Sequence, residues 1–169
     1  MDGPPSEYAR ALAENQRYVD SFDRRSLAPA PLTGLAIVAC MDTRLVVEDV
    51  LGLRPGDAHV IRNAGGLVTD DVIRSLIISQ QLMGTTEVLV IEHSRCGLHG
   101  AREADIRARA ARLTGESPDG VDIAFGAFPD LEANLRDQVD RIRTNRYLKD
   151  SPVHGLIYDV ETGRLHEVI

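Results

Sequence analysis

The sequence contains no tryptophan, and aromatic residues make up only 4% of its 169 positions. A core with few aromatic side chains must be built mainly from Val, Ile, Leu and Ala, which suits parallel strands buried between helices. Cysteine is also scarce: Cys40 and Cys96 alone exclude the dense disulfide framework of a small secreted fold. We therefore expect a reducing, cytoplasmic location in which both thiols stay available.

A surplus of positive charge is absent as well, because the formal net charge is −7. The basic residues are scattered along the chain, so we expect no nucleic-acid partner. No apolar stretch approaches the roughly 18 residues of a membrane span, and residues 1–5 lack the features of a signal peptide, so we expect no membrane partner. With 43% apolar residues the chain is long enough for one sizeable core, and we predict a single domain over residues 1–169.

Apolar segments and turn signals alternate in an order that predicts an α/β fold. The predicted strands are residues 35–39, 58–61, 87–91, 153–160 and 165–169. The predicted helices are residues 6–22, 45–51, 70–83, 101–113 and 131–142. This order favours a mostly parallel central sheet flanked by helices, with an antiparallel C-terminal edge strand and an N-terminal helical arm over residues 1–30. Ligands of such sheets bind beyond the carboxyl ends of the strands.

Three residues that can ligate a metal stand at such strand ends. Cys40 follows the first predicted strand, and His93 and Cys96 follow the third. Two thiolates and an imidazole suit zinc, and three protein ligands leave a fourth position free, as in a catalytic site. We expect the loop with Cys96 to open the next helix, whose backbone dipoles would favour the thiolate. The alternatives are two buried apolar thiols beside an unrelated histidine, or a redox pair in which the cysteines form a disulfide.

Polar and small residues near these ligands extend the candidate site. Asp42 and Arg44 lie on the same side of an extended segment, where a guanidinium can bind a carboxylate through two hydrogen bonds. Held ionised in this way, Asp42 would occupy the fourth metal position or accept a hydrogen bond from hydroxide. Gly65 and Gly66 are candidates for a narrow substrate pocket, although a tight turn explains them equally well.

Taken together, the segments Cys40–Arg44, Val60–Gly66 and His93–Gly97 resemble the β-class carbonic anhydrases, and the short tail hairpin is similar to that of compact prokaryotic members. The resemblance implies one Zn²⁺ per chain, ligated by Cys40, His93 and Cys96, with Asp42 and Arg44 as a gating dyad. It implies reversible hydration of carbon dioxide to bicarbonate by attack of zinc-bound hydroxide. It also implies a homodimer or a dimer of dimers, in which the arm over residues 1–30 packs on the partner subunit.

Two departures from the family pattern bear on the substrate. Arg95 stands where small members often carry an acidic residue, and the aromatic residues that line the pocket of plant-like members have no counterparts in residues 63–68. A carbonyl sulfide or carbon disulfide hydrolase that uses the same zinc site is therefore an alternative. A non-catalytic zinc-binding homologue with an obstructed fourth position is another. His99 is interpreted as an exposed helix histidine, with proton transfer as its alternative role.

Overall fold

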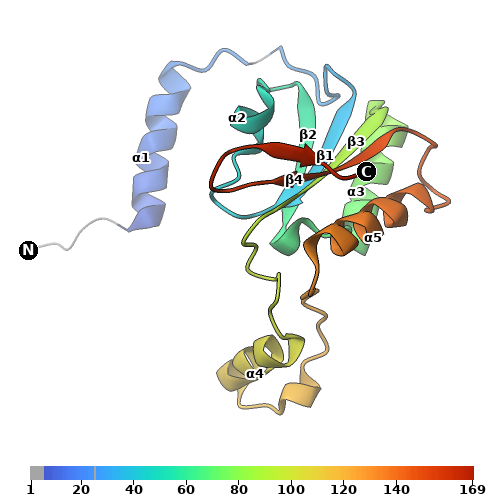
Figure 1. Cartoon of the computed structure of the whole chain (residues 1–169). Helices are drawn as coiled ribbons and strands as arrows, with labels where there is room; N and C mark the ends of the chain where they lie inside the picture. The colour runs from blue at the N-terminus through green and yellow to red at the C-terminus, as the bar shows by residue number, and fades with distance from the viewer. Residues whose placement is uncertain (1–5, 25) are drawn as a thin grey trace, which may run out of the picture.

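The structure is a computed structural model that describes residues 6–24 and 26–169. In this part of the chain, five strands form one sheet in the order β2-β1-β3-β4-β5 (Figure 1). The strands are β1 (Leu35–Cys40), β2 (Ala58–Asn63), β3 (Glu87–His93), β4 (Val153–Tyr158) and β5 (Leu165–Glu167). The pairs among β1 to β4 are parallel, and β5 runs antiparallel to β4. The predicted mostly parallel sheet with an antiparallel C-terminal edge is confirmed.

Helices pack on both faces of this sheet. The helices are α1 (Glu7–Asp20), α2 (Val47–Leu51), α3 (Asp70–Met83), α4 (Glu103–Thr114) and α5 (Leu131–Arg143), with short 3₁₀ turns η1 (Ala64–Gly66) and η2 (Pro118–Gly120). On one face, Leu76 of α3 and Leu135 of α5 join a buried cluster with Val90 of β3. The short α2 covers only part of the other face, where apolar strand residues stay partly exposed: Val60, Leu89 and Leu156.

The ends of α3 follow directly from the sequence. The Thr69 side chain accepts a hydrogen bond from the Val72 backbone N–H, which satisfies one of the free donors at the helix start. Gly84 ends the helix with φ 76°, in the left-handed region that glycine adopts without steric cost. Both ends agree with the helix predicted over residues 70–83, which is confirmed.

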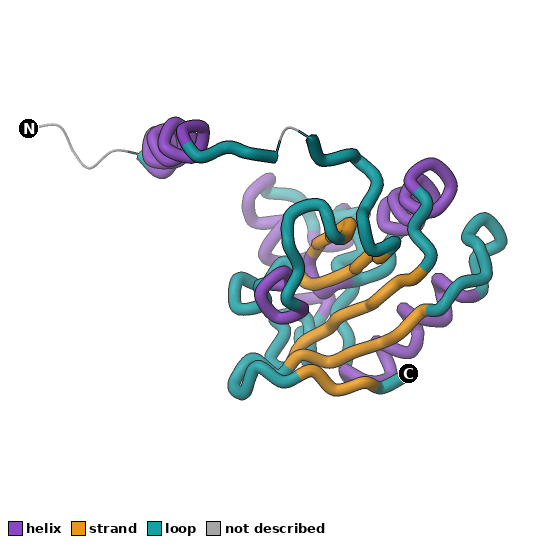
Figure 2. Tube along the Cα trace, turned by 90° about the horizontal axis from the view of Figure 1, so that it is seen from above, coloured by secondary structure: helices purple, strands orange, loops and turns teal. Residues whose placement is uncertain are grey.

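The predicted arm contains α1, which stands away from the sheet (Figure 2). No residue of α1 is buried against the rest of the described chain, although Tyr8, Leu12 and Val19 are apolar residues on one face of the helix. Residues 1–5 and Arg25 of this arm lie outside the described residues. None of the helices in residues 6–24 and 26–169 has both the length and the apolar character needed to cross a bilayer.

The helix predicted over residues 101–113 is confirmed as α4, which begins at Glu103, so the loop after Cys96 does not enter a helix directly. After Cys96 the chain instead pairs with a returning segment: the Gly100 N–H donates to the Phe128 carbonyl, and the Phe128 N–H donates to the Leu98 carbonyl. This pairing uses backbone groups that a helix would need. α4 and η2 consequently form a separate lobe away from the sheet (Figure 1), and the effect of this helix on the Cys96 thiolate stays a prediction.

Candidate metal centre

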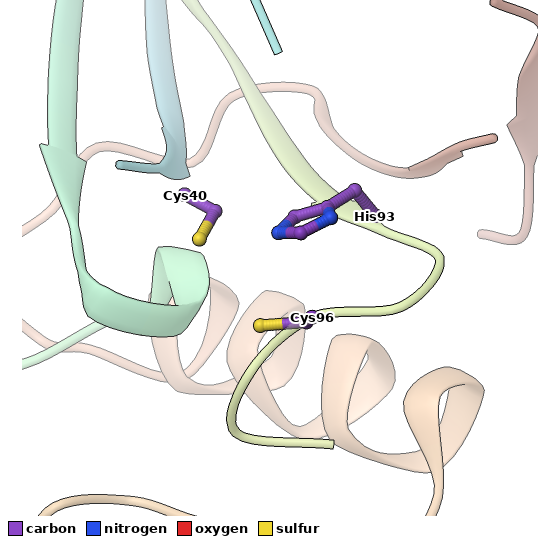
Figure 3. Close-up of side chains that lie close together, drawn as sticks. All are labelled: Cys40, His93 and Cys96. Atoms are coloured by element: carbon purple, nitrogen blue, oxygen red, sulfur yellow. The ribbon is translucent and has the colours of Figure 1, made fainter. Parts of the chain in front are cut away.

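The three predicted metal ligands meet at the carboxyl ends of adjacent parallel strands. Cys40 is the last residue of β1 and His93 is the last residue of β3, while Cys96 lies in the turn that follows. The two sulfur atoms and a ring nitrogen of His93 all lie within 4.8 Å of one another. All three residues are buried, and their side chains point toward one another (Figure 3).

The orientation of His93 suits a metal ligand. Its Nδ1 lies 2.9 Å from the Ser94 carbonyl, and because a carbonyl only accepts, Nδ1 carries the hydrogen. The neutral ring therefore presents a lone pair at Nε2. This Nε2 is buried and has no hydrogen-bond partner among residues 6–24 and 26–169. A buried polar atom without a partner is uncommon, and a cation between Nε2 and the two sulfurs would satisfy it.

The charge balance of the two thiols also favours a cation. A hydrogen bond from Cys96 lowers the pKa of the Cys40 thiol, although burial acts in the opposite direction. The same hydrogen bond, together with burial, raises the pKa of Cys96. The protein alone thus holds one buried thiolate, and a divalent cation would let Cys96 ionise as well. The donor set and its charge fit a zinc-type site.

Asp42 lies beside this triad and is bound by Arg44. Arg44 Nε donates to Asp42 Oδ1 at 2.9 Å and Nη2 donates to Oδ2 at 2.8 Å, which is the predicted bidentate pair. These hydrogen bonds hold the pKa of Asp42 below its ordinary value against the effect of burial. Asp42 Oδ2 lies 3.7 Å from His93 Nε2. The carboxylate is therefore ionised and adjacent to the metal position, while the role of Asp42 as a metal ligand stays a prediction.

Two neighbouring polar residues that the sequence interpretation left without a role hold this segment in place. Arg62 of β2 donates from Nε to the Cys40 carbonyl at 2.9 Å and from Nη2 to the Asp42 carbonyl at 2.8 Å. The Asn63 side chain exchanges two hydrogen bonds with the backbone of Leu67 across the η1 turn. Both residues belong to the Val60–Gly66 motif, so their type and position were visible. The partners of Arg62 depend on the register between β1 and β2, whereas Asn63 bonds locally.

The two glycines of the η1 turn lie in different surroundings. Gly65 lines a cavity of about 260 Å³ in front of the metal ligands, together with Cys40, Met41, Asp42, Ala64, Cys96, Gly97 and Leu98. Gly66 packs on the backbone of the ligand strands, where an added Cβ would lie 2.9 Å from Cys40 N and 3.2 Å from the Ile91 carbonyl oxygen. The pocket role of both glycines stays a prediction, and the close backbone contact of Gly66 requires the absence of a side chain.

The side chains of Arg95 and His99 are exposed and contact residues other than the metal ligands. Arg95 adopts φ 55°, and its guanidinium lies 2.8 Å from Glu161 Oε1 at an exposed position. His99 is exposed and its ring stacks on Phe128 with a centroid distance of 5.7 Å. His99 lies before α4, so its placement in a helix is wrong, because residues 97–101 pair with the segment around Phe128.

Glu92 was also overlooked in the sequence. It lies directly before His93, and it is almost fully buried with Asn134 Nδ2 donating to its Oε1 at 2.6 Å. Burial raises the pKa of Glu92 to about 8. An acidic residue at the end of the apolar run Val88–Ile91 is the signal that could have revealed it.

The fold and the site together define a class of protein, a parallel α/β sheet that carries a Cys-His-Cys metal centre and an ion-paired aspartate at its carboxyl edge. The family model described as carbonic anhydrase matches residues 35–115. β-Carbonic anhydrase 1 of Mycobacterium tuberculosis is 42% identical over 158 residues, which are 93% of this chain and 94% of that protein. This chain therefore belongs to the β-class carbonic anhydrase family, and its Cys-His-Cys triad is typical of the zinc enzymes in it.

Two further relatives place the chain within the family. A crystal structure of carbonic anhydrase from Streptococcus mutans superposes with a TM-score of 0.91 at 41% identity, and the match covers 99% of this chain and 100% of that chain. A carbon disulfide hydrolase of Acidithiobacillus thiooxidans is 37% identical over 150 residues, which are 78% of this chain and 75% of that protein. The hydrolase is thus a more distant relative than the two carbonic anhydrases.

Proposed function

We propose that this protein catalyses the reversible hydration of carbon dioxide to bicarbonate, with one zinc ion per chain held by Cys40, His93 and Cys96. The observation that carries the proposal is the convergence of the three ligand atoms within 4.8 Å beside an ionised, clamped Asp42. Similarity to carbonic anhydrases over nearly the whole chain supports this substrate. We further propose that residues 1–169 act as one β-carbonic-anhydrase-like domain.

The residues around the ligands divide the chemistry between them. A zinc ion with three protein ligands is a Lewis acid that lowers the pKa of water at its fourth position to about 7 and supplies a nucleophile at neutral pH. Asp42 accepts a hydrogen bond from the attacking water at Oδ2 and so turns a lone pair toward the substrate carbon. Arg44 keeps Asp42 ionised and aimed. Ala64, Gly65 and Leu98 give the cavity an apolar wall that suits a neutral, linear molecule.

The test is a comparison of substrates on one sample of known zinc content. We expect about one zinc ion per chain and rapid proton release from carbon dioxide in a stopped-flow indicator assay. Hydrogen sulfide release from carbon disulfide or carbonyl sulfide without hydration of carbon dioxide would instead identify the hydrolase. A zinc-loaded protein inactive on all three substrates would be a non-catalytic homologue. Low zinc content with oxidised thiols would identify the redox pair.

The roles within the site separate by substitution. Asp42→Ala should keep the zinc content and lower turnover by about 100-fold or more, the usual contribution of a group that positions or transfers a proton. Cys96→Ala should lose zinc, because it removes a ligand. Unchanged turnover in a zinc-loaded Asp42→Ala variant would show that the carboxylate has no part in the reaction.

We also propose that the protein is a homodimer or a dimer of dimers and that the arm over residues 1–30 packs on the partner subunit. The arm carries an apolar face that nothing in the described chain covers: Tyr8 is 75% exposed and Leu12 is 54% exposed. The partly exposed sheet face beside α2 offers a second apolar surface of the same kind. A reducing cytoplasm would keep the two thiols available for zinc, which supports the expected location.

A further inference from the structure

Phe128 lies against the metal centre although it is far from the ligands in sequence. It is 5% exposed and forms one buried cluster with Cys40 and Cys96, surrounded by the partly buried Leu67, Leu98 and Leu131. It is also the buried one of the three phenylalanines in the chain, because Phe22 is exposed and Phe125 is partly buried. An aromatic ring therefore reaches the sulfur ligands from the segment that follows the α4 lobe.

The backbone on both sides of Phe128 is fixed. Its N–H donates to the Leu98 carbonyl at 3.2 Å, and its carbonyl accepts from the Gly100 N–H at 2.8 Å. Two residues later, Asp130 caps α5 by accepting from the Ala133 N–H at 2.8 Å. The His99 ring stacks on Phe128 with an interplanar angle of 14°. The Phe128 ring thus has little freedom to move away from the sulfurs.

Phe128 also lines a second, separate cavity. It has a volume of about 170 Å³ and is lined by Phe128, Pro129, Asp130, Ala133, Asn134 and Asp137. Phe128 does not line the cavity that contains Asp42 and Gly65. Phe128 therefore belongs both to the buried cluster with the two cysteines and to the wall of this cavity, so its removal would open a path for water from the cavity to the sulfur ligands.

We propose that Phe128 is a positioning residue for the metal centre, a rigid apolar cover that holds Cys40 and Cys96 in place and keeps solvent and reagents away from their rear side. The inference rests on the proposed zinc site. An apolar shell around a metal controls solvent access to its ligands, and contacts between sulfur and an aromatic ring are themselves favourable. The open side with Asp42 remains the route for substrate, and the Phe128 side stays closed.

The experiment compares zinc-loaded Phe128→Ala and Phe128→Leu with the wild type. We expect Phe128→Ala to transfer zinc to a coloured chelator at least about 10-fold faster, within the range seen when outer contacts of a metal site are removed. Alkylation of the cysteines by iodoacetamide should accelerate in parallel. The thiolate charge-transfer band of the cobalt-substituted protein should shift. Phe128→Leu should restore most of each property, because it refills the volume with an apolar group.

Leu135→Ala is the matched control for a loss of stability alone. Leu135 of α5 is buried, as Phe128 is. It belongs to the cluster between α3, α5 and the sheet and not to the one around the cysteines. Equal zinc-transfer rates in the wild type and Phe128→Ala, or equal acceleration in Leu135→Ala and Phe128→Ala, would overturn the inference. If Phe128→Ala does not fold, Phe128→Val, which refills only part of the ring volume, takes its place in the same comparison with the wild type and Leu135→Ala. A wild type that binds no zinc would refute the proposed function itself.

Discussion

Gly66 offers the sharpest test of how the ligand strands are packed. Its φ of 67° lies in the left-handed region, where a side chain costs about 1–2 kcal/mol. A Cβ would also lie 2.9 Å from Cys40 N, 3.1 Å from the Ala39 carbonyl carbon and 3.2 Å from the Ile91 carbonyl oxygen. These atoms belong to the backbone and cannot rotate away, so overpacking adds about 1–3 kcal/mol. Gly66→Ala should therefore lower the free energy of unfolding by about 2–5 kcal/mol.

Gly84→Ala is the matched control. Gly84 has φ 76°, but nothing lies within 4 Å of its added Cβ, so this substitution carries the conformational cost of about 1–2 kcal/mol alone. Thermal unfolding, followed by circular dichroism with the same excess of zinc, measures both variants. At about 2–4 °C per kcal/mol for a chain of this size, Tm should fall by roughly 4–20 °C for Gly66→Ala and roughly 2–8 °C for Gly84→Ala.

The difference between the two glycine variants isolates the contact with the ligand strands. Because the nearest atom is the backbone nitrogen of Cys40, we also expect zinc affinity to fall in Gly66→Ala and to stay unchanged in Gly84→Ala. Equal losses of Tm and of zinc affinity in the two variants would refute the reasoning. Gly66 would then serve only as a turn residue.

Three further predictions follow from the same geometry. Arg62→Met removes the donors to the Cys40 and Asp42 carbonyls and should lower the free energy of unfolding by about 1–3 kcal/mol in denaturant unfolding. Arg74→Met, which removes only a surface ion pair, should change it by less than about 0.5 kcal/mol. Glu103→Gln should speed hydrogen exchange at the Phe125 and Ala127 amides. In the wild type the protection factors of these amides, which are corrected for the intrinsic exchange rate at each pH, should fall only as the pH falls through the lowered pKa of Glu103, since the amide hydrogen bonds favour the carboxylate. Leu12→Glu should shift analytical ultracentrifugation toward monomer, and Ala13→Glu on the opposite helix face should not.

The sequence predicted the parts of this structure that depend on local chemistry. Residue types at short separation explain the helix that begins after Thr69 and ends at Gly84. They also explain the strand that ends at Cys40 and the pairing of Asp42 with Arg44. The placement of His99 in a helix was wrong because long-range backbone pairing with Phe128 competes with helix formation. The contacts of Arg62 depend on strand register, which short patterns do not reveal.

Phe128 also shows that local sequence patterns do not reveal long-range contacts. Plant-like members of the family carry pocket aromatic residues in the segment that corresponds to residues 63–68, and this sequence has none there. The structure supplies a ring to the site from residue 128, after a lobe that leaves the sheet at Gly97 and returns before α5. Only the folded chain brings these segments together, so no local pattern in the sequence predicts the contact between Phe128 and the cysteines.

For the proposed reaction, the two sides of the metal centre must meet different demands. Carbon dioxide is neutral and enters most easily through an apolar opening, which the wall with Gly65 and Leu98 provides. Bicarbonate is an anion, and it must leave past Asp42, whose charge is balanced by Arg44. Outside the site, the net charge of −7 on the chain repels this anion. A closed rear wall at Phe128 leaves this single route for both molecules. The charged groups of this Asp42–Arg44 pair act on the anionic product far more than on the neutral substrate, so the same opening can admit one and release the other.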